Sequence, residues 1–573
     1  MLIFLFDERS ERKNHVFSSL PVVIGLCPWL LASARGHRPP PVVIDLCPWL
    51  PASARALPVS SHIQATLPRK VFTLTMLFNS YIFIFIFLPL VLLGWYGLNK
   101  LKKYELAKVF LVGMSLWFYG YFNNYYLLII TISILVNYTL SWFMTFSKTR
   151  FTSRIGLLTG IGINLAILFY FKYYDFFIDN INYIFHSDYA LKHILLPLGI
   201  SFFTFQQISF TVDRNEGELD HPSFINYAAF VTFFPQLIAG PIVFYKEMIP
   251  QFEDLNKRRF DSGNFAKGIS LFVLGLGKKV LLADMLALAT NFGFEQTYFL
   301  DTPSTLLVIL AYTFQIYFDF SGYNDMAIGL GYMFNIALPI NFNSPYKACS
   351  VKELWQRWHM TLSRFFVNYV YIPLGGSKKG RPRTILNTMI IFCLSGLWHG
   401  ANWTYVAWGT MQGLLVVWDN LGIVGIKGNK EKVPSKIHIP RWLGWFFTFS
   451  FFNLSLIFFR SENMTYAFQM FKNIFAFKNT GYLYKLAANM DIPEFYVIKQ
   501  AINLLAPDML STVYIVFFFI ALAISAFVLT RKNSLQIVAE TNYGSKFCWY
   551  ITIVFLWSLI SFSQVSTFIY FNF

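Results

Sequence analysis

The chain has 573 residues, of which 56% are hydrophobic, 20% aromatic and only 13% charged, and its formal net charge is +17. Soluble domains carry about twice that fraction of charged residues, so the composition excludes a soluble globular protein. The apolar runs approach or exceed about 18 residues without alternating, which excludes a β-barrel. An all-α, polytopic integral membrane protein is the remaining class, because in lipid only helices or closed barrels satisfy every backbone group.

The positive charge does not indicate a nucleic-acid partner. The lysines and arginines lie in short loops between apolar runs, which is the pattern of cytoplasmic loops in membrane proteins. The five cysteines form no C-x-x-C pair and have no Cys/His zinc spacing. We therefore expect no disulfide scaffold and no metal site.

Residues 1–75 differ from the rest of the chain. PVVIGLCPWLLASAR, from Pro21, returns as PVVIDLCPWLPASAR, from Pro41, a tandem copy offset by 20 residues. Two short copies interrupted by proline can neither span a membrane nor bury a core. We expect 1–75 to be a disordered extension unrelated to the membrane domain, which would occupy 76–573 with Met76 as the natural start.

From Met76 onward, apolar runs predict about 11 to 13 membrane segments. The expected segments are Leu77–Leu98, Val109–Tyr121, Tyr125–Phe146, Ile155–Phe177, Ile194–Val212, Phe224–Phe244, Phe265–Phe292, Leu306–Phe334, Ile385–Trp398, Trp403–Val417, Trp442–Phe459, Val513–Leu529 and Phe547–Phe562. With the lysine-rich loops in the cytoplasm, the native N-terminus and the segment Ser461–Asp508 lie outside.

Two of these segments carry unusual residues. Phe224–Phe244 contains Pro235, Gly240 and Pro241, which predicts a broken or re-entrant helix buried in protein or lining a cavity. Leu306–Phe334 contains Asp319 among aromatic residues, and a carboxylate at that depth requires a partner. The sequence leaves open whether that partner is structural or catalytic.

The most polar part of the membrane domain begins at Asn341. Ser350 with Glu353 three residues later predicts a capping box and a helix that starts near Val351. Three apolar residues, Trp355, Trp358 and Leu362, share one face at helical spacing. This pattern predicts that the helix lies in the membrane interface.

The stretch FCLSGLWHGANWTYVAWG, Phe392 to Gly409, places one histidine, His399, in membrane-length apolar sequence. An ionisable residue there is costly and indicates a functional site, although a histidine that joins helices by hydrogen bonds is the alternative. Gly396, Gly400 and Gly409 would let two backbones approach closely or bend.

Several motifs, in this order, resemble the membrane-bound O-acyltransferase (MBOAT) superfamily, and most closely its alginate O-acetyltransferase type. The motifs are LPLGISFFTFQQ, YFDFSGYNDMAIGLGYMF, LWQRWHMTLS, YVYIPLGGSKKG and SGLWHGANWTYVAWG. The resemblance is densest from about Leu195 to Gly413 and extends from Met76 to the C-terminus. It implies a fold with broken or re-entrant helices around a central funnel.

The resemblance also implies the site. The histidine of the WHG motif, His399, would be the catalytic base for an attacking hydroxyl, and His359 of the RWH motif would orient the donor or share the proton, unless it is only an interfacial histidine. Asn402 would donate to the developing oxyanion. The residues expected to contact substrate are Trp398, Asn402, Trp403 and Arg357.

The implied reaction moves an acyl group, expected to be acetyl, from a cytoplasmic thioester such as acetyl-CoA to a cell-surface or secreted polysaccharide. No bound cofactor is expected, the location is the plasma or inner membrane, and an extracytoplasmic hydrolase-like protein would accept the acyl group. Ser461–Asp508 is the expected docking segment, or an insertion without a function of its own. The alternatives are D-alanyl transfer to teichoic acid, a transporter, and a non-enzymatic scaffold.

Overall fold

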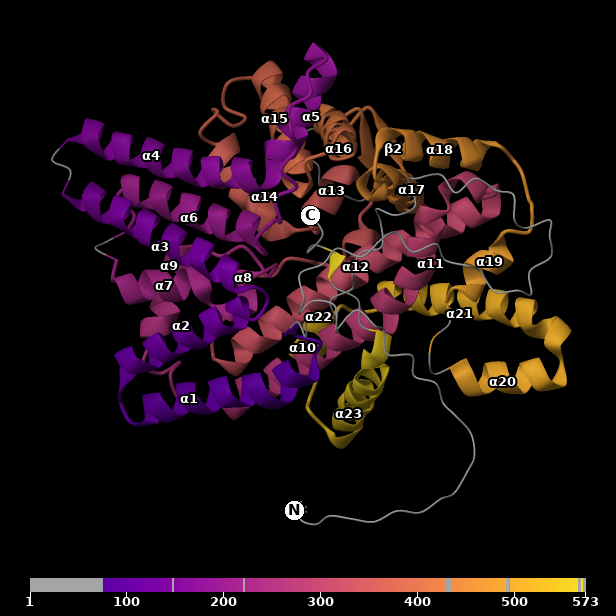
Figure 1. Ribbon diagram of the computed structural model, residues 1–573, viewed down its shortest axis with the longest axis horizontal. Coiled ribbons are helices and arrows are strands. Elements are labelled where there is room, and N and C mark those ends of the chain that lie inside the picture. Colours follow the sequence, from indigo (N-terminus) through magenta and orange to yellow (C-terminus); the bar gives the residue numbers. More distant parts are fainter. Residues whose placement is uncertain are drawn as a thin grey trace, which may run out of the picture. The chain divides into compact units, whose positions relative to one another are not determined.

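The computed structural model describes residues 76–569 apart from 147–148, 220–221, 428–434, 491, 493–494 and 565–567. The predicted 1–75 extension and its tandem repeat lie outside the described residues. Within the described part, regular structure is almost entirely helical (Figure 1), and the one sheet pairs β1 (Val424–Ile426) in parallel with β2 (Ile437–Ile439). The predicted all-α class is confirmed.

The first helices pack side by side in chain order, α1 on α2, α2 on α3, α3 on α4 and α4 on α6 (Figure 1). A π-helical turn precedes α1, and a second one, Phe169–Tyr173, joins α4 to α5. Asn123 and Thr149 cap α3 and α4 by accepting backbone hydrogen bonds in the first turn. The helices are α1 (Leu88–Lys100), α2 (Tyr104–Gly120), α3 (Asn124–Thr145), α4 (Arg150–Leu168), α5 (Tyr174–Phe185) and α6 (Ile200–Asn215).

The predicted broken helix is confirmed. Helix α7 (Phe224–Thr232) stops at Phe233, α8 (Phe234–Leu237) forms one turn, and the chain then runs without helix to α9 (Tyr245–Glu253). The break is buried, and side chains satisfy its polar groups: Phe234 N donates to Ser115 Oγ at 3.2 Å. An interrupted backbone is tolerated at this depth because protein rather than lipid surrounds it.

Helix α12 (Thr302–Met333) is the central helix. In its most apolar window 83% of the residues are buried, against 22–44% in the other helices long enough to cross a membrane. It crosses α10 (Ser262–Gly277) closely, because a Cβ on Gly275 would lie 2.5 Å from the carbonyl oxygen of Gly322. Small residues permit such crossings where lipid provides no hydrophobic driving force.

The partner of Asp319 is a lysine on the neighbouring helix. Lys279, in the π-helical turn Lys278–Ala283 that joins α10 to α11 (Asp284–Glu295), lies 2.6 Å from Asp319 Oδ1 and 2.7 Å from Asp284 Oδ1. All three side chains are buried. We interpret the cluster as structural, because its carboxylates are paired and it joins the π-helical turn to α12.

The segment after Asn341 starts a helix where predicted. Helix α13 (Val351–Trp355) begins after Ser350, whose Oγ accepts from the backbone N–H of Glu353 at 3.1 Å. The Glu353 carboxylate accepts a hydrogen bond from the backbone N–H of Cys349 at 2.9 Å. The capping-box pattern predicts the N–H of Ser350 as the donor, so the bond forms one residue earlier than predicted.

The prediction that this helix lies in the membrane interface is wrong. Helix α13 ends at Trp355, the chain turns through Trp358 and His359, and α14 (Met360–Phe366) starts in a new direction. Only 7% of Trp355, 2% of Trp358 and 2% of Leu362 is exposed. The Trp358 ring packs 5.1 Å from Phe342, so contacts with residues distant in sequence override the helical periodicity.

The remaining helices complete the body. Helices α15 and α16 lie at the top of Figure 1 with α13 and α14 below them, and α23 packs on α10. They are α15 (Arg381–His399), α16 (Trp403–Leu421), α17 (Arg441–Arg460), α18 (Met464–Phe475), α19 (Leu483–Ala488), α20 (Tyr496–Leu505), α21 (Leu510–Thr530), α22 (Ser534–Glu540) and α23 (Ser545–Ile560).

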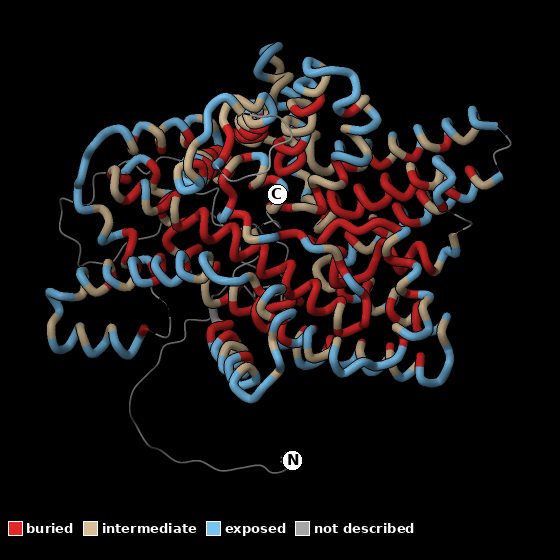
Figure 2. Tube along the Cα trace, turned by 180° about the vertical axis from the view of Figure 1, so that it is seen from behind, coloured by how far each residue is buried: buried red, intermediate tan, exposed pale blue. Residues whose placement is uncertain are grey.

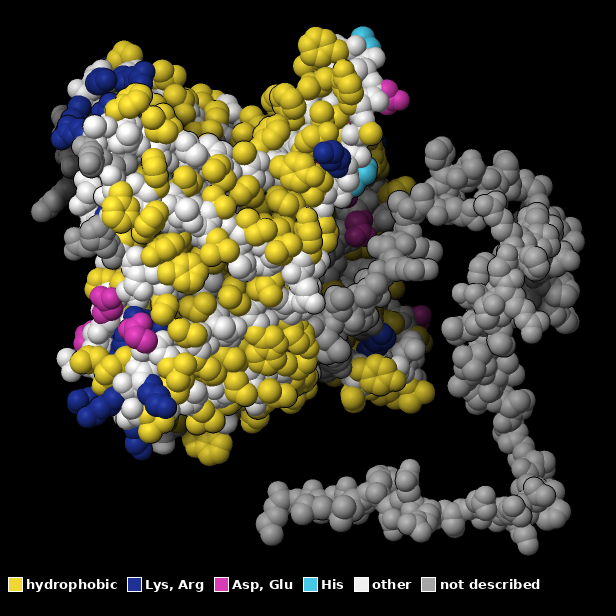
Figure 3. Space-filling model, turned by 60° about the vertical axis from the view of Figure 1, so that its left-hand side comes forward, with side chains coloured by type: hydrophobic (Ala, Val, Ile, Leu, Met, Phe, Trp, Pro, Cys, Tyr) yellow, Lys and Arg dark blue, Asp and Glu magenta, His cyan; other side chains and the backbone are white. Residues whose placement is uncertain are grey.

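Six helices in the described part of the chain are long and apolar enough to cross a membrane, which supports a multi-pass membrane protein. Of the other expected segments, α6 is a shorter helix, whereas Phe265–Phe292 lies in the continuous helical stretch formed by α10, the turn Lys278–Ala283 and α11. Figure 2 shows the buried residues gathered in the middle and the exposed ones on the outer helices. Figure 3 shows hydrophobic side chains over the middle of one face, with most Lys and Arg toward its left side. The six are Phe83–Lys100, Asn124–Thr145, Arg150–Phe185, Thr302–Met333, Arg441–Arg460 and Pro507–Thr530.

Candidate functional site

Two buried histidines that are 40 positions apart in sequence lie close together. His399 is the last residue of α15 and His359 immediately precedes α14, and their ring centroids are 6.5 Å apart. Only 2% of His399 and none of His359 is exposed. The fold thus brings the two histidines of the sequence motifs to one place.

The tautomer of His399 follows from its backbone contact. Nδ1 lies 2.6 Å from the carbonyl oxygen of Ser395, one turn earlier in α15. A carbonyl oxygen can only accept, so Nδ1 carries the hydrogen and the lone pair of the neutral ring is on Nε2. The ring packs edge-on against Trp398 at 4.8 Å, Trp408 at 5.1 Å and Phe459 at 5.2 Å.

Asn341 fixes the same tautomer in His359. The Asn341 Oδ1 accepts from Thr361 N at 3.1 Å and lies 3.1 Å from His359 Nδ1, so this Nδ1 is also the donor. His359 adopts a left-handed backbone with φ of 44°. Such a conformation costs free energy in a residue other than glycine, and residues of this kind cluster at functional sites.

Close packing of α15 on α16 positions the end of α15. A Cβ on Gly396 would lie 2.3 Å from the carbonyl oxygen of Tyr405, and a Cβ on Gly409 would lie 2.3 Å from that of Phe392. Gly400, which follows His399, would meet the Tyr405 ring at 2.1 Å. The predicted close approach at these glycines is therefore confirmed.

The carbonyl end of α15 is capped by side chains that the sequence reasoning missed. The Lys172 ammonium donates to the carbonyl of Trp398, and the Tyr173 hydroxyl donates to that of Leu397 at 3.0 Å. A cation at the C-terminus of a helix complements the partial negative charge there. The available signal was a lysine inside the apolar run Ile155–Phe177, because a cation at that depth indicates a functional role.

A polar pocket of about 330 Å³ opens beside this end of α15. Its lining combines charged side chains, aromatic rings and the backbone of the turn that follows His399. The residues that matter here are Lys172, Asp175, Gly400, Asn402 and Tyr405. The His399 ring is adjacent in sequence to this lining but is not part of it.

Of the four residues predicted to contact substrate, Trp398 lies at the histidine pair. Its ring centroid is 4.8 Å from that of His399 and 5.8 Å from that of His359. Its indole N–H is buried without a hydrogen-bond partner in the described structure, and so is that of Trp408. Buried donors without partners are uncommon and mark a place where a substrate atom or water completes the bonding.

The other three predicted contacts, Asn402, Trp403 and Arg357, each bond to other parts of the protein. Asn402 caps α16: its Oδ1 accepts from Thr404 N at 3.0 Å and its Nδ2 donates to the Glu462 carbonyl at 2.7 Å. Trp403 is 55% exposed and donates to Asn180 Oδ1 at 2.9 Å. The placement of Trp403 gives no support to its predicted position at the imidazole. Both roles stay predictions, and Asn402 also lines the polar pocket beside the end of α15.

The predicted substrate contact of Arg357 stays a prediction. Its guanidinium lies 2.9 Å from a Glu353 carboxylate oxygen and donates to the Asn343 carbonyl at 3.2 Å. These contacts hold the loop that precedes α13. Among the described residues, no group of three or more His, Cys, Asp or Glu is arranged to hold a metal ion.

Comparison with known proteins assigns the family. The sequence profile of the membrane-bound O-acyltransferase family matches residues 119–461. The chain is 37% identical over 535 residues to the peptidoglycan O-acetyltransferase of Helicobacter pylori, which covers 88% of this chain and 98% of that protein. It is 38% identical over 413 residues to the probable alginate O-acetylase AlgI of Pseudomonas aeruginosa, covering 70% and 75%, and 30% identical over 291 residues to the teichoic acid D-alanyltransferase of Streptococcus thermophilus, covering 47% and 69%. The chain belongs to the membrane-bound O-acyltransferase family and is an O-acyltransferase.

Proposed function

We propose that this membrane-bound O-acyltransferase transfers an acetyl group from a cytoplasmic thioester, such as acetyl-CoA, toward a hydroxyl of a cell-surface polysaccharide, and that it does so in the inner or plasma membrane. The observation that carries the proposal is the buried pair His399 and His359, 6.5 Å apart. Each ring donates its Nδ1 hydrogen to an oxygen of the fold, so each Nε2 keeps its lone pair.

In the proposed reaction, His399 Nε2 takes the proton of the attacking hydroxyl. The hydroxyl oxygen forms a bond to the thioester carbonyl carbon, the carbon–sulfur bond breaks, and the imidazolium returns the proton to the leaving thiolate. A neutral alcohol is a weak nucleophile, so a positioned base accelerates this step by about 10²- to 10⁴-fold. His359 orients the donor or shares the proton.

The Asn402 amide donates one N–H to the Glu462 carbonyl and caps α16 through Oδ1, so a single N–H is left for the developing oxyanion. The indole N–H groups of Trp398 and Trp408 flank His399 and are buried without hydrogen-bond partners in the described structure. We assign the oxyanion to one of these two donors, since a donor not engaged in the ground state stabilises charge that develops later.

Coverage favours a peptidoglycan-type acceptor. The alignment spans 98% of the Helicobacter pylori peptidoglycan O-acetyltransferase but 75% of the Pseudomonas aeruginosa alginate protein. D-alanyl transfer is less favoured because that alignment covers 47% of this chain. An extracytoplasmic acyl-accepting protein would dock on the helices of the segment Ser461–Asp508, where α20 exposes 84% of Leu504.

Replacing His399 tests the proposal. In cells lacking the native gene, His399→Gln should lower ester-linked acetate in purified peptidoglycan and in secreted polysaccharide by at least about 100-fold at equal membrane abundance. His193→Gln, at an exposed loop histidine, is the matched control and should leave acetate unchanged. Retained acetate in His399→Gln removes this histidine from the chemistry. Labelled acetate that crosses vesicles without entering an ester would instead identify a transporter.

A further inference from the structure

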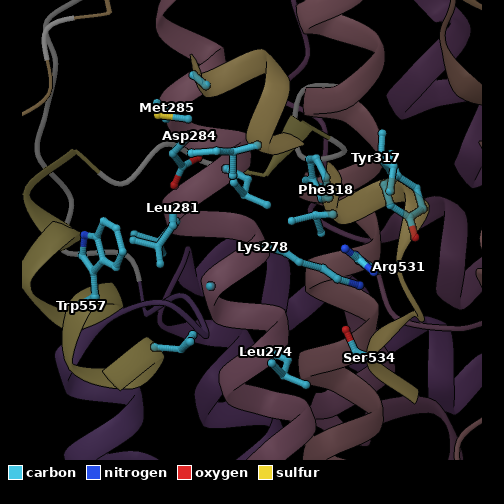
Figure 4. Close-up of a pocket in the computed structure, with 18 of the residues that line it drawn as sticks. Leu274, Lys278, Leu281, Asp284, Met285, Tyr317, Phe318, Arg531, Ser534 and Trp557 are labelled. Atoms are coloured by element: carbon cyan, nitrogen blue, oxygen red, sulfur yellow. The ribbon is translucent and has the colours of Figure 1, made fainter. Parts of the chain in front are cut away.

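A second pocket, of about 350 Å³, lies away from the histidine pair, between α10, α12, α21, α22 and α23. Its two ends differ in chemistry. Figure 4 shows Lys278, Arg531 and Ser534 together at one end and Leu281 and Trp557 at the other. Most of the remaining lining is aliphatic or aromatic. The pocket thus combines a cationic end with an apolar body.

The cationic end lies at the end of a helix that is long and apolar enough to cross a membrane. The candidate span that includes α21 ends at Thr530, and Arg531 is the next residue. The apolar body follows the flanks of α21 and α23, through residues such as Ile524 and Val554. This order, charge at the interface and hydrocarbon-like walls deeper, matches the order of groups in a phospholipid.

Arg531 is the charge in this pocket that the protein itself does not balance. Lys278 lies 2.6 Å from Asp325 Oδ2, and Lys532 pairs with Glu540. In the described part of the chain no carboxylate forms a salt bridge with Arg531, whose guanidinium lies 4.2 Å from the Phe527 ring centroid. A guanidinium in this position can bind a phosphate through two parallel hydrogen bonds.

We propose that the pocket holds one anionic phospholipid, with its phosphate at Arg531 and an acyl chain along α21 and α23. Lipid tails are as apolar as the walls, so the tail has little preference for the pocket over the bilayer. Selection must therefore come from the headgroup, which makes Arg531 the decisive residue. Tyr317 lines the pocket and its ring lies 6.4 Å from that of Trp358, so the lipid supports the wall behind the His359 turn.

Photocrosslinking of the full-length protein tests this assignment. The probe is a photoreactive phosphatidylglycerol in phosphatidylcholine vesicles that contain the purified protein, with adducts mapped by mass spectrometry. Adducts should concentrate on peptides of α21, α22 and α23. Arg531→Gln should reduce them about fivefold, the effect of one interfacial arginine. Arg441→Gln, at the exposed start of α17, is the matched control and should leave them unchanged.

A second variant fills the pocket instead of changing its charge. Ile524 is half exposed, so Ile524→Trp should fold, which size-exclusion chromatography checks, and should block the adducts while Arg531 is intact. Adducts spread evenly over the lipid-facing helices, or insensitive to both variants, overturn the proposal. Displacement of the probe by acetyl-CoA also overturns it, because the pocket would then belong to the donor. None of these outcomes depends on acyl transfer.

Discussion

The Lys172 ammonium donates a hydrogen bond to the backbone carbonyl of Trp398, the residue before His399. The same ammonium lies 3.4 Å from Ser201 Oγ and 5.7 Å from the Trp398 ring centroid. The contact joins the π-helical turn after α4 to the end of α15, 226 residues later. It makes Lys172 a positioning residue for the proposed base, since it holds the helix turn from which that imidazole projects.

Replacing this cation should lower the rate of transfer without changing protein abundance. Lys172→Met removes a charge-assisted hydrogen bond worth roughly 1.5–3 kcal/mol, so kcat should fall about ten- to 100-fold with little change in KM for the donor. Lys172→Arg keeps the charge and should restore part of the activity. Lys192→Met is the control, because the Lys192 ammonium packs on the rings of Tyr170 and Tyr174 rather than bonding a carbonyl of α15. A Lys172→Met variant with normal kcat contradicts the positioning role.

The glycine contact between α15 and α16 should tolerate no side chain. Gly396→Ala places a Cβ 2.3 Å from the Tyr405 carbonyl oxygen and should destabilise the protein by about 1–3 kcal/mol through overpacking. Thermal unfolding in detergent measures the change. Gly162→Ala in α4, where a Cβ meets nothing within 4 Å, should be neutral or stabilising by up to about 1 kcal/mol. Equal melting temperatures for the two variants would refute the close approach.

Asn341 should be essential for the geometry of His359. Asn341→Ala removes the oxygen that accepts from the Thr361 N–H and the His359 Nδ1–H, and losing a buried acceptor costs about 1–3 kcal/mol. Both the melting temperature and the transfer rate should fall. Asn264→Ala, which removes a partly exposed contact to Asn335, is the control. If only stability falls and the rate per folded molecule is unchanged, His359 has no part in the chemistry.

The cap of α12 should make stability depend on acidic pH. Burial raises the pKa of the Asp301 carboxyl, but hydrogen bonds from Ser304, Thr480 and Tyr482 outweigh this and hold the pKa below its usual value. A lowered pKa in the folded state stabilises the protein above the unfolded pKa of about 3.9, and this contribution is lost as pH falls through the folded pKa.

Melting temperatures measured between about pH 3 and pH 7 check this expectation. Asp301→Asn should be less stable than the native protein at neutral pH and should lose less stability on acidification. Asp508→Asn, at an exposed position, controls for the loss of one carboxylate. The same acid-dependent loss in the native protein and Asp301→Asn would show that this cap is not the group that titrates.

Much of the fold could be predicted from the local chemistry of the sequence. Long apolar runs predict a membrane protein because unpaired backbone groups are not tolerated in lipid. Pro235 predicts the broken helix, and Gly396 and Gly409 predict the close crossing of α15 and α16. The catalytic role of His399 stays a prediction, although the fold does bring this residue beside His359. Each of these inferences uses only neighbours within a few turns of the chain.

Contacts between distant segments decided the rest. The helix expected through Trp355, Trp358 and Leu362 breaks after one turn because the aromatic core buries all three side chains. The pairing of Lys172 with the end of α15, and of Lys279 with Asp319, joins residues far apart in sequence that no local pattern connects. The free energy of such contacts depends on distances set by helix packing, so they become visible only when the whole chain is folded.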